Sequence, residues 1–174
     1  MVAVERVKKG SVEGEDSLEK LELGQPKIGE HVYARVLRVE DRFVKAEILA
    51  REDPRSGEMR ILRTTFQGIL FKENARSYDL ETVELLKCFR PHDIIKAKVL
   101  TEQVGGKDSS TVLSTTDDSL GVVFARCDAT GVLMVPRSFH SSQCMVSRIR
   151  EPRKNAEPPT KDLVGEAVDQ EMRE

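Results

Sequence analysis

The strongest constraint on the fold of this chain is a series of short segments in which apolar and polar residues alternate. Residues 31–39, HVYARVLRV, place small apolar side chains on one face and polar or larger ones on the other. Residues 43–50, FVKAEILA, repeat the pattern after a short charged break. A period of two residues is that of a half-buried β-strand. We therefore predict two antiparallel strands joined by a tight turn.

Three further strands are predicted downstream, over residues 59–71, 93–100 and 110–116. Gly68 interrupts the first of them, and we expect a bulge or a close backbone approach there. Between residues 74 and 88 the apolar spacing becomes helical, and Asp79 is placed to cap one short helix. Five strands with a helix between the third and the fourth predict an all-β fold, the five-stranded OB barrel, whose closure removes the sheet edges.

A second, smaller β unit is predicted over residues 119–150. Its short apolar runs offer too little surface to fold without a staple or a neighbour. It contains two of the three cysteines of the chain, and each is followed three residues later by a hydroxyl residue, Cys127 by Thr130 and Cys144 by Ser147. The pattern is that of two Cys-x-x-Cys metal knuckles that have each kept only the first sulfur.

The ligand chemistry of this small unit does not suit a metal. Structural zinc takes four tetrahedral ligands, and Thr130 and Ser147 supply no thiolate. His140 could join Cys127 and Cys144, but three ligands leave an open position that suits catalytic rather than structural zinc. We therefore predict a zinc-ribbon-like unit without metal that is stabilised by packing on a neighbour, and we predict no cofactor.

Composition excludes several classes of function. Lysine plus arginine number 28 against 30 aspartate plus glutamate, so no whole-chain basic field attracts nucleic acid or an anionic membrane. The apolar stretches fall short of the ~20 residues that a bilayer span needs, so no membrane partner is expected. An odd cysteine count without a signal-peptide pattern indicates a reducing compartment. Residues 151–174, charged and punctuated by proline, are expected to form a flexible tail.

Three motifs resemble the S1-type RNA-binding domain. They are GEHVYARV at 29–36, FQGILFKENAR at 66–76 and FRPHDIIKAKV at 89–99. The run LSTTDDSLGVV at 113–123 narrows the resemblance to the RNA exosome cap subunits that have an S1-type domain and a zinc-ribbon-like tail but no KH domain.

The resemblance extends over residues 27–154 and includes a closing segment that ends at Arg153-Lys154. It implies an S1-type domain at 27–118. Residues 1–26, which alternate valines with charges and then become acidic, are expected to be the remnant of an N-terminal β domain plus a linker.

This resemblance also implies a function. The chain would be a non-catalytic RNA-binding subunit that helps guide RNA into the exosome ring for 3′-to-5′ processing and degradation, including rRNA processing and mRNA decay. Its partners would be RNA, the RNase-PH-like ring subunits and the other cap subunits, in the nucleus, the nucleolus and the cytoplasm. The small unit would dock on the ring, and the barrel would face the RNA.

Aligned with the S1 pattern, the residues expected to contact RNA are Arg42, Lys45, Phe71, Lys72 and Arg76. An OB barrel binds nucleic acid on the face of its second and third strands, through aromatic side chains and cations. Here cations replace the usual aromatics, so binding should be weak, poorly sequence-selective and salt-dependent. The alternative is that the cations form an ordinary solvated face and that Phe71 belongs to the core.

Two other functions are alternatives. One is a free-standing S1-type RNA-binding accessory factor outside the exosome. The other is a metal-dependent nuclease that would use Asp117, Asp118 and Asp128 as ligands. Adjacent residues on a strand point to opposite faces, so Asp117-Asp118 fits a turn better than a chelate. The histidines fall in different elements, with no arrangement of nucleophile and base. We therefore predict that the chain is not an enzyme.

Overall fold

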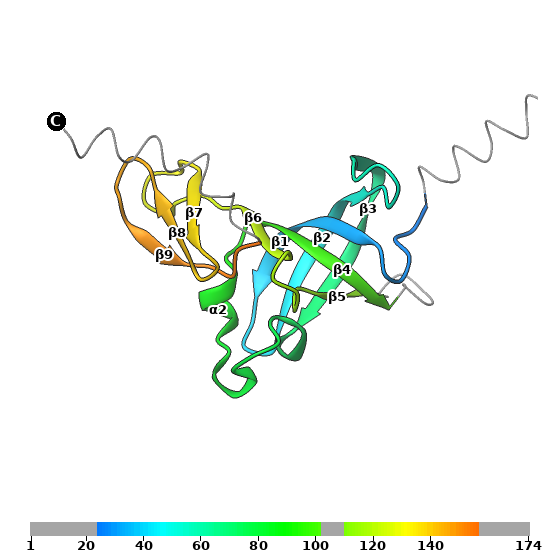
Figure 1. The fold of residues 1–174 in the computed structure, drawn as a ribbon, viewed down its shortest axis with the longest axis horizontal. Helices are drawn as coiled ribbons and strands as arrows, with labels where there is room; N and C mark the ends of the chain where they lie inside the picture. The colour runs from blue at the N-terminus through cyan, green and yellow to red at the C-terminus, as the bar shows by residue number, and fades with distance from the viewer. Residues whose placement is uncertain (1–23, 102–109, 157–174) are drawn as a thin grey trace, which may run out of the picture.

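The computed structural model of the chain describes residues 24–101 and 110–156 (Figure 1). Strands dominate these residues, which confirms the all-β class. The strand expected near the N-terminus and the tail beyond residue 156 lie outside the described residues. Among the described residues, no helix has the length and apolar character of a membrane span.

Five strands form a sheet that closes on itself. They are β1 His31–Val39, β2 Phe43–Glu52, β3 Met59–Phe71, β4 Ile94–Thr101 and β5 Thr111–Ser114. The strand order is β1-β2-β3-β5-β4, and β4 also pairs with β1. All these pairs are antiparallel except β3 with β5. The predicted bounds of the five strands agree with the observed ones to within two residues.

The inward faces of these strands form the core. Fully buried positions on β1 and β2 are Val32, Ala34, Val36, Val44, Ala46 and Ile48. Gly68 on β3 is also buried, and a Cβ atom there would lie 2.7 Å from Leu113 Cδ1 on β5. Side chains of neighbouring strands therefore occupy the space beside Gly68, and β3 runs through this residue without the bulge that was the other expectation.

The single helix predicted between residues 74 and 88 is wrong. The structure has the 3-10 turns η1 Lys72–Asn74 and η2 Leu80–Thr82, followed by the one-turn helix α2 Leu85–Cys88. Asp79 adopts a left-handed conformation with φ 49° and makes no side-chain cap. So short a helix is marginal by itself, and burial of Val83 and Leu85 in the core determines the path instead.

The boundary predicted at residue 118 falls just before a strand that pairs with the larger sheet. Strand β6, Gly121–Phe124, pairs antiparallel with β4 and so extends the larger sheet. The small unit has its own three-stranded sheet of β7 Met134–Ser138, β8 Ser141–Cys144 and β9 Arg150–Pro152. Figure 1 shows this sheet beside the closed sheet, next to α2 and β6.

Residues 151–156, which the sequence placed in the predicted tail, are folded. Arg153, Lys154 and Asn155 are only 1%, 5% and 2% exposed. The amide of Val122 donates to Lys154 O at 2.8 Å, and the segment thus joins β6. Gly121 has φ 137°, and a Cβ atom there would lie 2.4 Å from Lys154 O. Residues 151–156 are therefore folded between the two sheets, and we call residues 153–155 the closing segment.

Candidate nucleic-acid interface

Four of the five residues predicted to contact RNA lie together at one end of the closed sheet. Arg42 is in the turn between β1 and β2, and Lys45 follows on β2. Phe43 pairs with Phe71 across β2 and β3. The amide of Lys72 donates to Arg42 O at 2.9 Å, which brings the end of β3 against the turn. We call Arg42, Lys45, Phe71 and Lys72 the hairpin patch.

The hairpin patch is accessible and retains positive charge. Phe71 is 37% exposed, so it is a surface residue and not part of the core. Lys45 Nζ lies 5.9 Å from the centroid of the Phe43 ring, within cation–π distance. Within the described residues, Arg42, Lys45 and Lys72 have no ion-pair partner. Such cations beside exposed rings can follow a phosphate backbone.

Arg76, the fifth predicted residue, is not part of this patch. It follows η1 and lies at the junction between the closed sheet and the small unit, where it lines a cavity of about 210 Å³. Its guanidinium carbon lies 5.2 Å from the centroid of the Tyr78 ring. The structure therefore separates the predicted residues into a group of four and one residue elsewhere.

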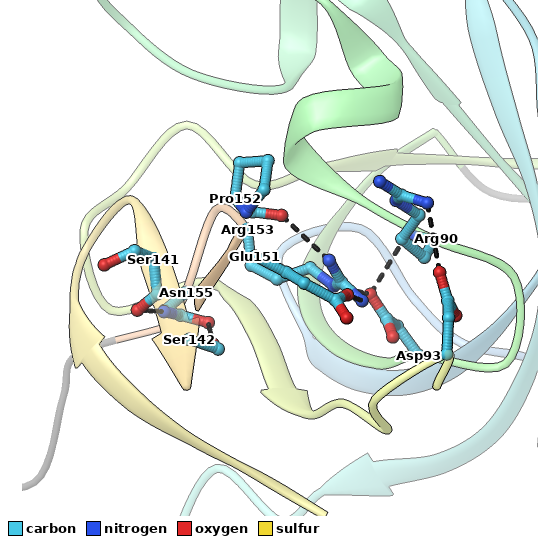
Figure 2. Close-up of polar contacts among 9 residues, drawn as sticks. Arg90, Asp93, Ser141, Ser142, Glu151, Pro152, Arg153 and Asn155 are labelled. Atoms are coloured by element: carbon cyan, nitrogen blue, oxygen red, sulfur yellow. Dashed lines mark hydrogen bonds and ion pairs between the residues drawn. The ribbon is translucent and has the colours of Figure 1, made fainter. Parts of the chain in front are cut away.

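A buried ionic cluster holds the small unit at this junction (Figure 2). Arg153 Nε donates to Asp93 Oδ2 at 2.9 Å, and its terminal nitrogens donate to Glu151 Oε2 and Pro152 O, each at 2.9 Å. Asp93 Oδ2 also accepts from the amide of Arg90 at 3.0 Å. Burial raises the pKa of Asp93 to about 6, although the Arg153 charge opposes the shift. The cluster joins the start of β4 to the end of β9.

Lys154 and Asn155 complete the attachment. Lys154 Nζ donates to Asp117 O at 2.7 Å and to Leu120 O, and burial lowers its pKa to about 8. Asn155 Nδ2 donates to Ser138 O at 2.8 Å and to Ser141 O at 2.9 Å. Its Oδ1 accepts from the Ser142 hydroxyl at 3.0 Å. Figure 2 shows Asn155 beside Ser141 and Ser142 of β8.

Sequence reasoning missed the role of the closing segment because residues 151–174, to which it belongs, are charged and punctuated by proline, as is typical of a tail. The resemblance to the family's arginine-lysine segment did include Arg153 and Lys154, and it could have indicated that these residues are folded. It did not indicate which residues they contact.

The two knuckles face each other as their sequence pattern suggested. Thr130 Oγ1 lies 3.2 Å from Cys144 Sγ, and Cys127 Sγ lies 3.9 Å from Ser147 Oγ. Hydrogen bonds from the hydroxyls of Ser147 and Thr130 lower the pKa of Cys144 to about 6. The amide of Gly131 donates to Cys127 O at 2.8 Å and closes the first knuckle. The hydroxyls thus occupy the positions of the missing sulfurs.

His140 is not close to these cysteines in the fold. Its Nδ1 lies 3.2 Å from Tyr78 Oη at the junction, so the three-ligand alternative with Cys127 and Cys144 is wrong. Among residues 24–101 and 110–156, no group of three His, Cys, Asp or Glu side chains is placed to hold a metal ion.

The carboxylates of the nuclease alternative do not form a set. Asp117 begins a turn in which the amide of Leu120 donates to its carbonyl at 3.1 Å, as the turn interpretation predicts. Asp128 Oδ2 forms an ion pair with Arg90 at 3.1 Å. The arrangement needed for two-metal hydrolysis is not formed by these three residues.

Comparisons with known proteins give a consistent result. Residues 55–102 match a family model described as exosome component EXOSC1/CSL4. The chain is 37% identical over 131 residues to the exosome complex component CSL4 of Homo sapiens, an alignment that covers 75% of this chain and 63% of that protein. It is 32% identical over 133 residues to exosome complex component csl4 of Schizosaccharomyces pombe, with 76% and 68% covered. The chain thus spans a little under two thirds of the human relative.

Proposed function

The chain belongs to the exosome component CSL4 family, and from this premise we propose that it is a non-catalytic, RNA-binding cap subunit of the RNA exosome. It guides RNA into the ring for 3′-to-5′ processing and degradation by other subunits. The observation that carries this proposal is the identity of 32–37% to exosome complex components over about three quarters of the chain.

The hairpin patch is the proposed RNA contact. Three cations without ion-pair partners among the described residues and an exposed phenylalanine supply phosphate contacts and one stacking surface. With so few aromatics, charge contributes most of the binding free energy, so affinity falls steeply with salt and depends little on sequence.

The small unit is the proposed contact with the RNase-PH-like ring subunits, and the other cap subunits are further partners. Support comes from exposed apolar side chains on this unit, where Leu133 is 51% and Val146 68% exposed. Exposed apolar surface on a small folded unit favours a protein interface. The chain works in the nucleus, including the nucleolus, and in the cytoplasm.

Affinity purification of the tagged chain from native extract, followed by mass spectrometry, tests the proposal. We expect ring and cap subunits of the exosome in near-equal amounts, and migration far above the 19.6 kDa of the chain alone. A free-standing accessory factor would migrate at its own mass without these subunits, and that result would overturn the proposal.

A further inference from the structure

A second basic site lies at the junction of the closed sheet and the small unit. The cavity of about 210 Å³ is lined from both sides, by Arg76 and Lys87 from the segment between β3 and β4 and by His140, Arg153 and Lys154 from the small unit and closing segment. The cavity exists only because the closing segment is folded against α2, where the amide of Lys154 donates to Cys88 O at 2.8 Å.

The cations of this cavity differ in whether their N–H groups have hydrogen-bond acceptors or ion-pair partners. The nitrogens of Arg153 are engaged by Asp93, Glu151 and a carbonyl, and Lys154 Nζ is engaged by two carbonyls. Lys87 forms an ion pair with Glu84 at 2.9 Å. Arg76 alone among these cations has no acceptor in the described residues, and its Nε is buried without a hydrogen-bond partner.

A partly buried guanidinium whose inaccessible Nε has no acceptor favours an anionic ligand. Buried donors in proteins are nearly always paired, with protein, water or ligand. Within the cavity, Lys87 forms an ion pair with Glu84, and the ammonium of Lys154 is directed to two carbonyls beside the Asp117 and Asp118 carboxylates. Arg76 therefore leaves uncompensated positive charge. The planar fork of a guanidinium matches two oxygens of a phosphate.

The surroundings of Arg76 favour the phosphate of an RNA strand over a carboxylate of a protein. Tyr78, whose ring lies under the guanidinium, is 38% exposed, and it meets the His140 ring edge-on with centroids 5.8 Å apart. An exposed aromatic ring beside a phosphate contact is the arrangement on which single-stranded bases stack. Arg76 is also four residues from Lys72, so their Cα atoms lie within ~14 Å of each other. One strand can therefore reach both places.

We propose that the junction cavity is a second RNA site, in which the Arg76 guanidinium binds a backbone phosphate and Tyr78 stacks on a neighbouring base. The inference rests on the proposed function, because its ligand is the same RNA. It adds a contact that requires the small unit to be attached, since half of the cavity wall comes from that unit. RNA therefore runs from the hairpin patch to the junction.

The test is fluorescence anisotropy of the full chain with a labelled oligouridylate of about twelve nucleotides, within the site sizes of OB-type folds. Arg76→Gln should weaken binding about tenfold, the loss expected for one charge-assisted contact. The slope of log K against log salt should become shallower by ~0.7, the value for one phosphate of a single strand. Tyr78→Ala should weaken binding at least about fivefold without changing that slope.

Arg55→Gln is the matched control, because Arg55 is an exposed arginine in the loop that joins β2 to β3, at the opposite end of these strands from the hairpin patch. It should change neither affinity nor slope. If Arg76→Gln impairs folding, as judged by its Tm, Arg76→Lys replaces it, and it should weaken binding with the salt slope unchanged. Equal affinity and slope for wild type and the Arg76 variants would overturn the inference, and so would equal losses in Arg55→Gln.

Other outcomes separate this inference from the proposed function. If Arg76→Gln binds RNA normally but loses a partner in affinity purification, the cavity holds a protein carboxylate and the RNA assignment is wrong. A wild-type chain that co-purifies with exosome subunits but binds no oligonucleotide would overturn the second site and leave the cap-subunit assignment intact.

Discussion

The closed sheet and the small unit are stabilised by different kinds of contact. The closed sheet buries aliphatic side chains from all five strands, with residues such as Val36, Ile48 and Leu113 fully inaccessible. The small unit contributes few large apolar side chains, and the closing segment buries an arginine, a lysine and an asparagine instead. The first region supplies its own core, whereas the second depends on directional polar contacts with the first. Variants that act on one region and leave the other intact can test this contrast.

The largest expected effect comes from Arg153. Arg153→Ala leaves the Asp93 carboxylate buried without its cation, which should lower the free energy of unfolding by about 3 kcal/mol. Urea denaturation measures the change. Arg150→Ala, an exposed arginine three residues earlier, serves as control and should cost less than about 0.5 kcal/mol. Equal losses in the two variants would mean that the buried cluster does not hold the small unit.

Regular strands could be predicted from sequence because their signal is local. Alternation over β1 to β5 depends on neighbours two residues apart, and it placed the bounds correctly to within two residues. The hairpin patch followed from the S1 resemblance, since β2 and β3 bring its members together.

The attachment of the small unit could not be predicted in the same way. The Asp93–Arg153 hydrogen bond joins residues 60 positions apart and leaves no periodic trace. Arg76 lies in the junction cavity and not in the hairpin patch, and no local pattern showed that residues as distant as His140 would complete this cavity.

Restoring the two missing sulfurs should let a bound zinc ion stabilise the small unit, in addition to its contacts with the closed sheet. Thr130→Cys combined with Ser147→Cys would place four thiols at the facing knuckles, the ligand set of structural zinc. With free zinc at 100 times the dissociation constant, the folded state should gain about 2.7 kcal/mol. Zinc titration followed by thermal unfolding measures the gain.

Each single substitution is the control for the double one, because three sulfurs do not complete the tetrahedral site. A double variant whose Tm does not respond to zinc would show that the knuckles are too far apart to share an ion.

Gly121→Ala should loosen the small unit while the closed sheet remains folded. At φ 137° an alanine is strained, and its Cβ would lie 2.4 Å from Lys154 O, so the closing segment has to move. We expect a loss of about 2 kcal/mol. Limited proteolysis should then cut after residue 120 before it cuts the closed sheet. Gly131→Ala, at φ 68° with no atom within 4 Å, is the matched control and should leave the cleavage pattern unchanged.

The smallest effect is a pH dependence centred on Asp93. Burial raises the pKa of this carboxyl in the folded state to about 6, whereas an unfolded chain has a value near ~3.9. The folded state therefore binds the proton more tightly, and the stability that Asp93 contributes is greatest below pH ~4 and is lost as the pH rises through about 6. Between pH 4 and pH 7 the loss should be on the order of 2 kcal/mol, because each unit of the pKa difference is worth ~1.4 kcal/mol.

Urea denaturation of the wild type and Asp93→Asn at pH 4 and pH 7 isolates this contribution, since the other carboxyl groups titrate equally in both proteins. The stability of the wild type relative to the asparagine variant should fall between the two pH values. A relative stability that rises instead would mean that Arg153 holds Asp93 ionised more strongly than burial disfavours its charge. The attachment of the small unit would then be strongest at neutral pH. The difference between the two regions would be smaller, because the polar contacts of the junction would stabilise the fold as well as orient the small unit.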